Sequence, residues 1–261
     1  MAAHRSIARA LAASLPLLAG AVARAEPPLN VCVDTDHAPF SSSATPTQGL
    51  DIDVGQALAA QLGRTAQFVW VDVPNRGGLS KALREHLGTA RCDLFTAVPV
   101  GGDEPLDKRW RQSPPYAVLR YRWAAAPDQP VPADPPVRAR AIGVVSATPA
   151  DLYLHTHGLR RTPYPNNAAL LDALSAGEVP VALVWSAALS TATPPWVLSP
   201  RGPDDPALRT ALTLLTRSTD GALGDAVTAA LTALAADGTL ARLRARHGLP
   251  EDTMPSLAPT P

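Results

Sequence analysis

The residues that could do chemistry lie directly behind the first apolar strand of the chain. Residues 29–33 are followed by Asp34, Asp36 and His37, and then by Phe40. Carboxylates next to an imidazole can exchange protons, bind a cation or hold a polar ligand. Ligands of open α/β sheets bind at the edge where the strands end. The pattern therefore predicts a site that presents polar groups at this edge.

Alternating strands and helices are predicted to position these residues. Val54, Leu58 and Leu62 repeat at helical spacing, and Gly63 follows where such a helix would end. This alternation is typical of a parallel sheet with right-handed crossovers, so the predicted fold class is α/β. The elements expected in this part of the chain are strands at 31–33, 67–71 and 92–98 and helices at 53–62 and 79–87.

A proline-rich stretch at 127–136 separates this series from a second one. Before it, residues 117–123 alternate between apolar and polar side chains, which predicts a strand with one solvent-exposed face. After it, Thr148 is expected to be the N-cap of a helix whose first residue is Pro149. The second series is expected to hold strands at 141–145 and 179–185 and a helix at 167–176, and two further helices are expected at 223–234 and 240–247.

The N-terminal segment 1–25 contains the three parts of a secretory signal peptide in order. Arg5 and Arg9 lie in a basic start, residues 10–22 form an apolar run too short to span a bilayer, and Ala23-Arg24-Ala25 is a cleavage site. The alternative is a buried N-terminal helix. The signal peptide predicts export to the periplasm with Glu26 as the first mature residue, and no cysteine follows the site to predict a lipid anchor.

The mature chain has no surplus of positive charge. The full chain has 261 residues with 23 basic and 23 acidic side chains. Cleavage after Ala25 removes three arginines and no acid, so the mature chain carries three more acidic than basic side chains. This balance argues against nucleic acid or an anionic membrane as a partner. The length is sufficient for two lobes, each with its own core.

The sequence contains two cysteines, Cys32 and Cys92, at similar points of two apolar segments. An exported protein folds in an oxidising compartment, which favours a disulfide between them. If the two segments are parallel neighbouring strands, the geometry of a bridge is possible. The alternative is a pair of buried free thiols.

Several motifs follow one another through nearly the whole mature chain. They resemble those of the type II periplasmic solute-binding proteins of family 3, whose best-known members are amino-acid receptors of ABC importers. The resemblance implies two α/β lobes, each a mostly parallel sheet flanked by helices, with a ligand cleft between them that closes by hinge bending. It implies a first lobe made of residues 26–123 and 200–261 and a second made of 124–199. The motifs are Val-Asp-x-x-His-Ala-Pro-Phe from residue 33, Gly-Leu-Asp-Ile-Asp-Val from residue 49, Cys-Asp-Leu-Phe-Thr-Ala from residue 92, Ser-Pro-Pro-Tyr from residue 113 and Ala-Ala-Asp-Gly-Thr-Leu from residue 235.

Two charged positions of the amino-acid receptors hold uncharged residues in this chain. In that class an Arg after the third strand of the first lobe holds the ligand carboxylate, and the matching position is Pro105. The acid of the second lobe that holds the ligand ammonium group corresponds to Trp185. Because burial of a zwitterion without either partner is costly, an ordinary amino acid is not the expected ligand.

Other motifs resemble those of a narrower group, the binding-protein-like components associated with quinoprotein (PQQ-dependent) methanol and alcohol dehydrogenases. These components assist the dehydrogenase in the periplasm and do not feed an importer. Pro180 and Ser186-Ala187 depart from the group, in which an acidic residue and Gly-Pro are common. The shared features are Cys-Asp-x-x-x-x-Val-Pro-x-Gly from residue 92, Val-Ala-Leu-Val-Trp from residue 181 and the early Cys32.

Six residues are predicted to face a ligand in the cleft. His37 could stack on a ligand, donate a hydrogen bond or titrate near neutral pH, or it could simply pack beside Phe40. Thr148 has a sufficient structural reason as an N-cap, and Trp185 could equally pack within a buried strand. The six residues are Asp34, His37, Phe40, Thr96, Thr148 and Trp185.

The sequence predicts no metal site, no cofactor and no enzymatic activity. The acids at Asp34, Asp36, Asp51 and Asp53 do not form the compact loop that a calcium ion needs, and Asp53 is explained as an acid in the first turn of a helix. The sequence contains no nucleophile-elbow, phosphate-loop or zinc motif. An enzyme with His37 and Asp34 as an acid–base pair ranks last, although a few family members are dehydratases.

The preferred hypothesis is a periplasmic accessory component associated with a quinoprotein alcohol or methanol dehydrogenase. The alternative is the receptor of an ABC importer for a small solute other than an ordinary amino acid. The protein partner is the dehydrogenase in the first case and an ABC permease in the second. In either case the protein is expected to be a monomer without a membrane anchor, with a possible small-molecule ligand between its lobes.

Overall fold

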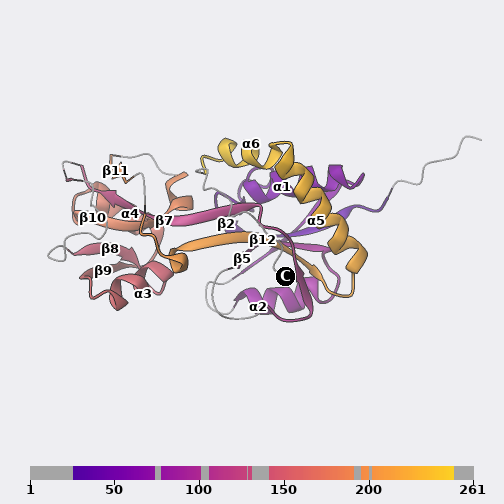
Figure 1. Cartoon of the computed structure of the whole chain (residues 1–261), viewed down its shortest axis with the longest axis horizontal. Coiled ribbons are helices and arrows are strands. Elements are labelled where there is room, and N and C mark those ends of the chain that lie inside the picture. Colours follow the sequence, from indigo (N-terminus) through magenta and orange to yellow (C-terminus); the bar gives the residue numbers. More distant parts are fainter. Residues whose placement is uncertain are drawn as a thin grey trace, which may run out of the picture.

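The computed structural model describes residues 26–73, 78–100, 106–127, 129–130, 141–190, 195–199 and 202–249. Its strands and helices form two groups, which Figure 1 shows joined by two long strands, β7 (Ala117–Ala125) and β12 (Arg209–Arg217). We call the group that includes Leu29 lobe 1 and the other group lobe 2. The predicted α/β fold with two lobes is confirmed.

Lobe 1 is a sheet with helices on both faces. Its helices α1, α5 and α6 pack on one another, and α2 continues directly into a π-helix at Leu83–Leu87 on the opposite face of the sheet (Figure 1). Its strands are β1 (Leu29–Asp34), β4 (Ala66–Val71), β5 (Leu94–Val100) and β6 (Trp110–Gln112), with the hairpin β2 (Asp36–His37) and β3 (Ser41–Ser42) beside them. Its helices are α1 (Leu50–Gln61), α2 (Gly78–Ala82), α5 (Gly221–Ala236) and α6 (Thr239–Arg246).

Lobe 2 is a smaller sheet built on the far half of β7. It places β10 next to β7 in antiparallel fashion, and β8 and β9 follow in parallel. Short 3-10 helices at Ser186–Ser190 and Pro206–Leu208 lie at its junctions with lobe 1. Its other elements are β8 (Ile142–Val145), α3 (Pro149–Thr156), β9 (Arg161–Tyr164), α4 (Asn167–Ser175), β10 (Val181–Trp185) and β11 (Val197–Leu198).

One strand, β7, takes part in the sheets of both lobes. Its residues 117–120 pair with β12, whereas its residues 121–125 pair with β10. The sheet order is therefore continuous across the molecule, β4-β1-β5-β12-β7-β10-β8-β9. The expected exposed face of β7 is half-buried, since the guanidinium of Arg122 donates to the carbonyl oxygen of Ser199 at 2.6 Å. The two lobes are therefore connected through one continuous strand.

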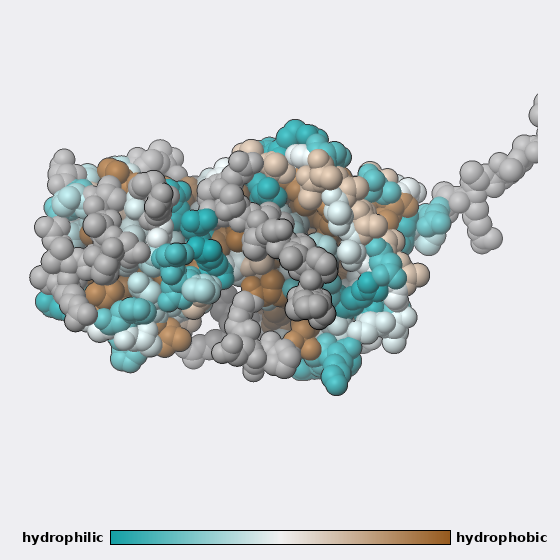
Figure 2. All heavy atoms as spheres, in the orientation of Figure 1, coloured by the Kyte–Doolittle hydropathy of each residue, from teal (hydrophilic) through white to brown (hydrophobic). Residues whose placement is uncertain are grey.

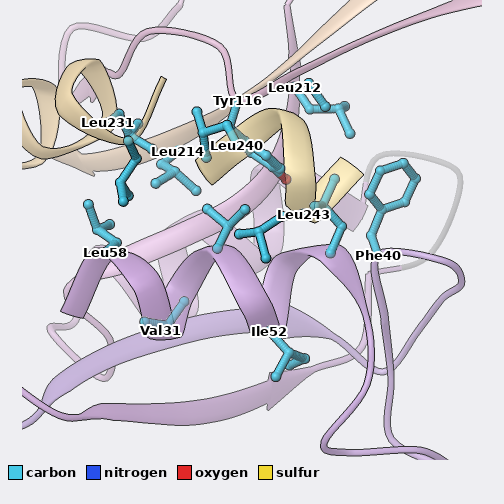
Figure 3. Close-up of a cluster of buried hydrophobic side chains, with 14 of the residues drawn as sticks. Val31, Phe40, Ile52, Leu58, Tyr116, Leu212, Leu214, Leu231, Leu240 and Leu243 are labelled. Atoms are coloured by element: carbon cyan, nitrogen blue, oxygen red, sulfur yellow. The ribbon is translucent and has the colours of Figure 1, made fainter. Parts of the chain in front are cut away.

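The largest hydrophobic core lies between the sheet of lobe 1 and the helices α1, α5 and α6. Figure 3 shows Leu240 and Leu243 of α6 lying over α1, and Leu231 of α5 lying above Leu58. Burial of a leucine side chain stabilises the fold by about 2 kcal/mol, so α6 is a structural part of lobe 1. In Figure 2 hydrophilic residues cover much of the visible face, and hydrophobic residues gather near the middle, where the lobes meet.

The predicted fold class is present, but the sheet is mixed and some of its strands were not expected. A mostly parallel sheet is predicted for each lobe, but β12 is antiparallel to both β5 and β7, and β10 is antiparallel to β7. The strands β6, β9 and β12 were not predicted. In β12 the threonines at 213 and 216 interrupt the apolar residues yet are themselves buried, so neither an apolar run nor an alternation is visible. In β9 the residue Pro163 argues against a strand, and it is tolerated because β9 is the last strand in the sheet order.

Most of the predicted helices are present. The α3 helix begins as expected, because the Thr148 side chain accepts a hydrogen bond from the Asp151 N–H and Pro149 is the first helical residue. The helix predicted at 79–87 is only partly right, since its second half is the π-helix at Leu83–Leu87. The predicted signal peptide, the proline-rich residues 131–136 and Pro105 lie outside the described residues.

Candidate ligand-binding cleft

A hollow of about 400 Å³ lies where the ends of the lobe 1 strands face the end of β10. Because β1 and β5 are parallel neighbours, the residues that follow them meet at one edge of the sheet. The residues of this hollow that carry polar or aromatic groups include Asp34, Asp36, His37, Thr96 and Trp185. We call this hollow the cleft.

The rings of His37 and Trp185 line one side of the cleft. The rings of His37 and Trp185 are nearly parallel, with centroids 6.2 Å apart and planes inclined by 10°. Phe40 lies behind them, with its ring centroid 4.8 Å from that of His37 and 5.9 Å from that of Trp185. Phe40 is completely buried, so it supports the other two rings from within the core of lobe 1.

The loop that carries His37 is held in place by its own backbone. The Asp36 N–H donates to the Asp34 side chain at 3.1 Å, and the Phe40 N–H donates to the His37 carbonyl at 2.8 Å. Gly49 closes the loop where it meets α1, because a β-carbon at this position would lie 2.1 Å from the Phe40 carbonyl oxygen. The loop therefore presents Asp34, Asp36 and His37 to the cleft from a fixed base.

A completely buried carboxyl group, that of Asp51, lies behind the cleft. The Tyr116 hydroxyl donates to its Oδ1 atom at 2.5 Å, and the Thr96 hydroxyl lies 2.8 Å from its Oδ2 atom. Burial raises the pKa of the Asp51 carboxyl above its ordinary value of 3.8, and the hydrogen bond from Tyr116 opposes this effect. Burial also raises the pKa of the Tyr116 hydroxyl well above its ordinary value, so this group stays a proton donor.

The Thr96 hydroxyl lies between Asp51 and the backbone of β1. The Thr96 hydroxyl has one proton but lies within hydrogen-bonding distance of two oxygens, Asp51 Oδ2 at 2.8 Å and the Cys32 carbonyl at 3.2 Å. When Asp51 is protonated, its own O–H donates to Thr96, and Thr96 donates to Cys32. Every polar group then has a partner, as buried groups require. Thr96 lines the cleft, but its hydroxyl forms its hydrogen bonds with Cys32 and Asp51 of lobe 1.

A bulge in β5 shapes the floor of the cleft. The pairing of β5 with β12 shifts between Thr213 and Leu215, opposite Thr96 and Ala97. Ala97 has a φ of 52°, a left-handed conformation that is unfavourable for alanine, and its N–H donates to the Tyr116 hydroxyl at 3.0 Å. Neither Asp51 nor Ala97 was among the predicted site residues. The only sequence signal is the position of Asp51 between two apolar residues, Leu50 and Ile52.

The structure brings most of the predicted site residues together. Asp34, His37, Thr96 and Trp185 line the cleft, and Phe40 lies directly behind it. Thr148 lies elsewhere, at a hollow of about 690 Å³ between α3 and the start of β12, where it caps α3 and donates to the Val145 carbonyl at 2.8 Å. Their roles toward a ligand remain predictions.

The described lining of the cleft carries acidic side chains and no Arg or Lys side chain. Its carboxylates are those of Asp34 and Asp36. Trp185 ends β10, at the place where an acid was expected in amino-acid receptors. Across the parts of the chain that the structure describes, no group of three metal-ligating side chains is found.

The two cysteines form the predicted disulfide. Cys32 in β1 and Cys92, just before β5, have α-carbons 5.7 Å apart and are bonded to each other. The strands are parallel neighbours, as the prediction required. The bridge fixes the base of the two strands whose ends form the cleft.

Two α/β lobes joined by two strands, with a hollow between the strand ends, define a protein of the two-lobed solute-binding class. The model of the bacterial extracellular solute-binding proteins, family 3, matches residues 29–250, and the chain belongs to this family. A search of curated proteins finds no sequence match. Within the described residues, no helix is long and apolar enough to cross a membrane.

Several solved structures have the same fold. The L-cystine solute receptor of Neisseria gonorrhoeae, in its unliganded open conformation, is 18% identical, with a TM-score of 0.69 over 88% of this chain and 96% of that one. The ancestral cationic amino acid solute-binding protein AncCDT-1 is 22% identical, with a TM-score of 0.67 over 84% and 94%. MxaJ from Methlophaga aminisulfidivorans MPT is 19% identical, with a TM-score of 0.64 over 85% and 99%. At these identities the likeness concerns the fold.

Proposed function

We propose that this protein is a solute-binding-protein-like accessory component of a periplasmic quinoprotein alcohol or methanol dehydrogenase. The observation that carries the proposal is the position of Trp185, whose ring stacks over His37 where an amino-acid receptor would hold the ligand ammonium group. The described cleft lining contains no Arg or Lys that could hold a carboxylate. Within the described residues, the two lobes are thus present without the charged pair that holds an amino acid.

The energetic argument is one of desolvation. A zwitterion that enters a cleft loses its hydration, and only charged partners offset that loss. Here the carboxylate of an amino acid would face Asp34 and Asp36, which have the same sign. The motifs shared with dehydrogenase-associated binding proteins support the accessory role, whereas the fold similarity to solved structures does not bear on it.

The proposal is tested by purification of the tagged mature protein from the periplasm of its native host. We expect a quinoprotein dehydrogenase to co-purify, identified by its mass and by dehydrogenase activity in the eluate. A tagged amino-acid receptor of the same fold, treated identically, is the matched control and should not retain the enzyme. Absence of any dehydrogenase from the eluate contradicts the proposal.

The same proposal predicts no response to amino acids. The melting temperature of the purified protein should stay constant when each of the common amino acids is added at millimolar concentration. For comparison, a ligand present at one hundred times its dissociation constant stabilises a protein by about 2.7 kcal/mol. A clear upward shift with one amino acid would show that the cleft is an ordinary receptor site.

A second candidate is a receptor for a small solute other than an ordinary amino acid. The volume of the cleft, about 400 Å³, favours it because small-molecule sites are commonly about 300 Å³ or larger. Native mass spectrometry of the protein from the periplasm would then show a bound small molecule. The ligand should be lost in Trp185→Ala and kept in Trp185→Phe.

The cleavage site and the lobe boundaries are also part of the proposal. N-terminal sequencing of the exported protein should begin at Glu26. Lobe 2, proposed as residues 124–199, interrupts a lobe 1 formed by 26–123 and 200–261. The junction at 123–124 lies inside the buried strand β7, so limited proteolysis should cut first near residue 200. A first cut inside α1 or α5 would contradict the boundaries.

A further inference from the structure

A second hollow, of about 500 Å³, shares no lining residue with the cleft. It lies in lobe 1 where the π-helix, the segment before β6 and the end of β12 meet. Its described lining contains basic, hydroxyl and aromatic side chains and no acidic one. We call it the basic pocket, and its principal residues are Arg84, Lys108, Arg109, Trp110, Arg217 and Thr219.

The cationic side chains of the basic pocket differ in whether they already form hydrogen bonds or ion pairs within the protein. Arg217 is fully engaged, because its guanidinium bonds to Asp220 and to the carbonyl oxygens of Leu87 and Cys92. Arg109 pairs with Asp107. Within the described residues, the side chains of Arg84 and Lys108 form no hydrogen bond or ion pair. Among the residues that the structure describes, two cations at this pocket therefore have no side-chain partner.

The backbone around the pocket is rigidly held. Trp110 of β6 pairs with Arg217 of β12, and the Ser218 hydroxyl donates to the Lys108 carbonyl at 2.6 Å. The Ser218 N–H donates to the Arg109 carbonyl at 2.8 Å. The segment that carries Lys108 and Arg109 is therefore fixed to the end of β12 before any ligand arrives, which lowers the entropic cost of binding.

The opposite side of the pocket is the π-helix. Helical turns of this kind are rare and often occur at functional sites. Gly88 follows the π-helix and lies close to Trp110. A β-carbon at this position would lie 3.3 Å from the indole ring and 2.7 Å from the Arg84 carbonyl oxygen. This close packing brings the turn that carries Arg84 against the tryptophan.

We propose that the basic pocket is a binding site for a small molecule that carries oxyanions, either carboxylates or phosphate. Guanidinium groups bind planar carboxylates and phosphates through paired hydrogen bonds, and an ammonium group adds a point charge. The indole of Trp110, over which the Arg109 guanidinium already lies at 5.4 Å, offers an apolar wall beside these charges. The cleft, lined by Asp34 and Asp36, would repel the same ligand.

The size and shape of the pocket favour a small molecule over an acidic protein segment. Its volume of about 500 Å³ is that of a concave small-molecule site, and protein interfaces bury far larger areas. The inference does not depend on the proposed association with a dehydrogenase.

The test is calorimetric titration of the mature protein with citrate and, separately, with inorganic phosphate at low ionic strength. We expect saturable binding of at least one of the two at a single site. Arg84→Gln and Lys108→Gln should each weaken it about tenfold, because each removes one charge-assisted contact. Arg160→Gln is the matched control, since Arg160 is exposed, its side chain has no hydrogen bond or ion pair within the described residues, and it lies in lobe 2.

The outcomes distinguish a carboxylate site from a phosphate site, and both from a result that contradicts the proposal. Saturable binding of citrate alone identifies a carboxylate site, and binding of phosphate alone identifies a phosphate site. Equal binding by Arg84→Gln, Lys108→Gln and Arg160→Gln, or no saturable binding of either anion, overturns the proposal. Unchanged circular dichroism and melting temperature of the variants ensure that a loss reflects binding and not folding.

Discussion

At the scale of single residues, Asp51 organises the polar contacts behind the cleft. It joins the first turn of α1 to Thr96 of β5 and to Tyr116 before β7, residues that are 45 and 65 positions away in the sequence. Sequence patterns cannot reveal such contacts, because an acid near the start of a helix already has a local explanation in the helix dipole. The fold supplies the information that this carboxyl is buried.

The raised pKa of Asp51 predicts a pH effect on stability. The folded protein holds the proton of Asp51 more tightly than the unfolded chain, whose carboxyl titrates near 3.8. The contribution of this group to stability is therefore greatest below pH 3.8 and declines as the pH rises from there to the folded pKa. Asp51→Asn imitates the protonated form, so the variant should gain stability relative to the wild type as the pH rises.

The measurement is urea denaturation of both proteins at several values between pH 4 and pH 8. Asp172→Asn is the control for the loss of a negative charge, because Asp172 is an exposed acid of α4 whose side chain forms no hydrogen bond or ion pair within the described residues. A difference between Asp51→Asn and the wild type that stays constant over this range, or that falls with rising pH, would contradict the protonated state.

Tyr116→Phe is expected to destabilise the protein by about 2 kcal/mol, because it leaves two buried groups without their partner. These groups are the Asp51 carboxyl and the Ala97 N–H. Tyr164→Phe is the control, since the Tyr164 hydroxyl forms no hydrogen bond within the described residues. Equal stability of the two variants in chemical denaturation would show that the Tyr116 hydroxyl has no structural role.

At the scale of elements, the sequence predicts well those helices and strands whose formation depends on residues close together in the chain. The α3 start at Thr148 and the helix through Leu58 follow from capping and spacing within a few residues. The β12 strand has no such signal, because two buried threonines interrupt its apolar residues. One of them, Thr213, donates to the Val98 carbonyl at 3.1 Å. Its place between β5 and β7 therefore becomes visible only in the structure.

The same distinction applies to the site. Asp34 and His37 were predicted because they follow an apolar strand, and Trp185 because it ends another. The bulge at Ala97 was not predicted, because it depends on the pairing of β5 with β12, a strand from the far end of the chain. The basic pocket likewise combines residues from three distant segments.

The disulfide is predicted to be a major source of stability for lobe 1. It closes a loop of 60 residues, which corresponds to about 4 kcal/mol when the entropy of the unfolded chain is considered. Replacement of Cys32 and Cys92 together by alanine should lower the free energy of unfolding by about this amount. Treatment of the wild type with a reductant during denaturation should have the same effect, and equal stability of the oxidised and reduced proteins would refute it.

At the scale of the whole molecule, Trp185 couples the two lobes. Its ring packs against the core of lobe 1 and against a core cluster of lobe 2. Trp185→Ala should therefore lower stability by about 3 kcal/mol and separate the calorimetric unfolding into two transitions. Trp185→Phe should retain one transition and lose less than about 1.5 kcal/mol. A single transition in Trp185→Ala would mean that β7 and β12 alone couple the lobes.

The position of β12 also determines the order in which the protein can be completed during synthesis. Whether the chain emerges from the ribosome or from the proposed export route, β5 and β7 emerge long before the strand that separates them in the sheet. Until residues 209–217 emerge, β5 and β7 each have an unpaired edge, the arrangement that promotes pairing with another chain. A newly made chain is thus most vulnerable to aggregation during the interval in which lobe 2 is already forming, and the arrival of a single late strand ends that interval.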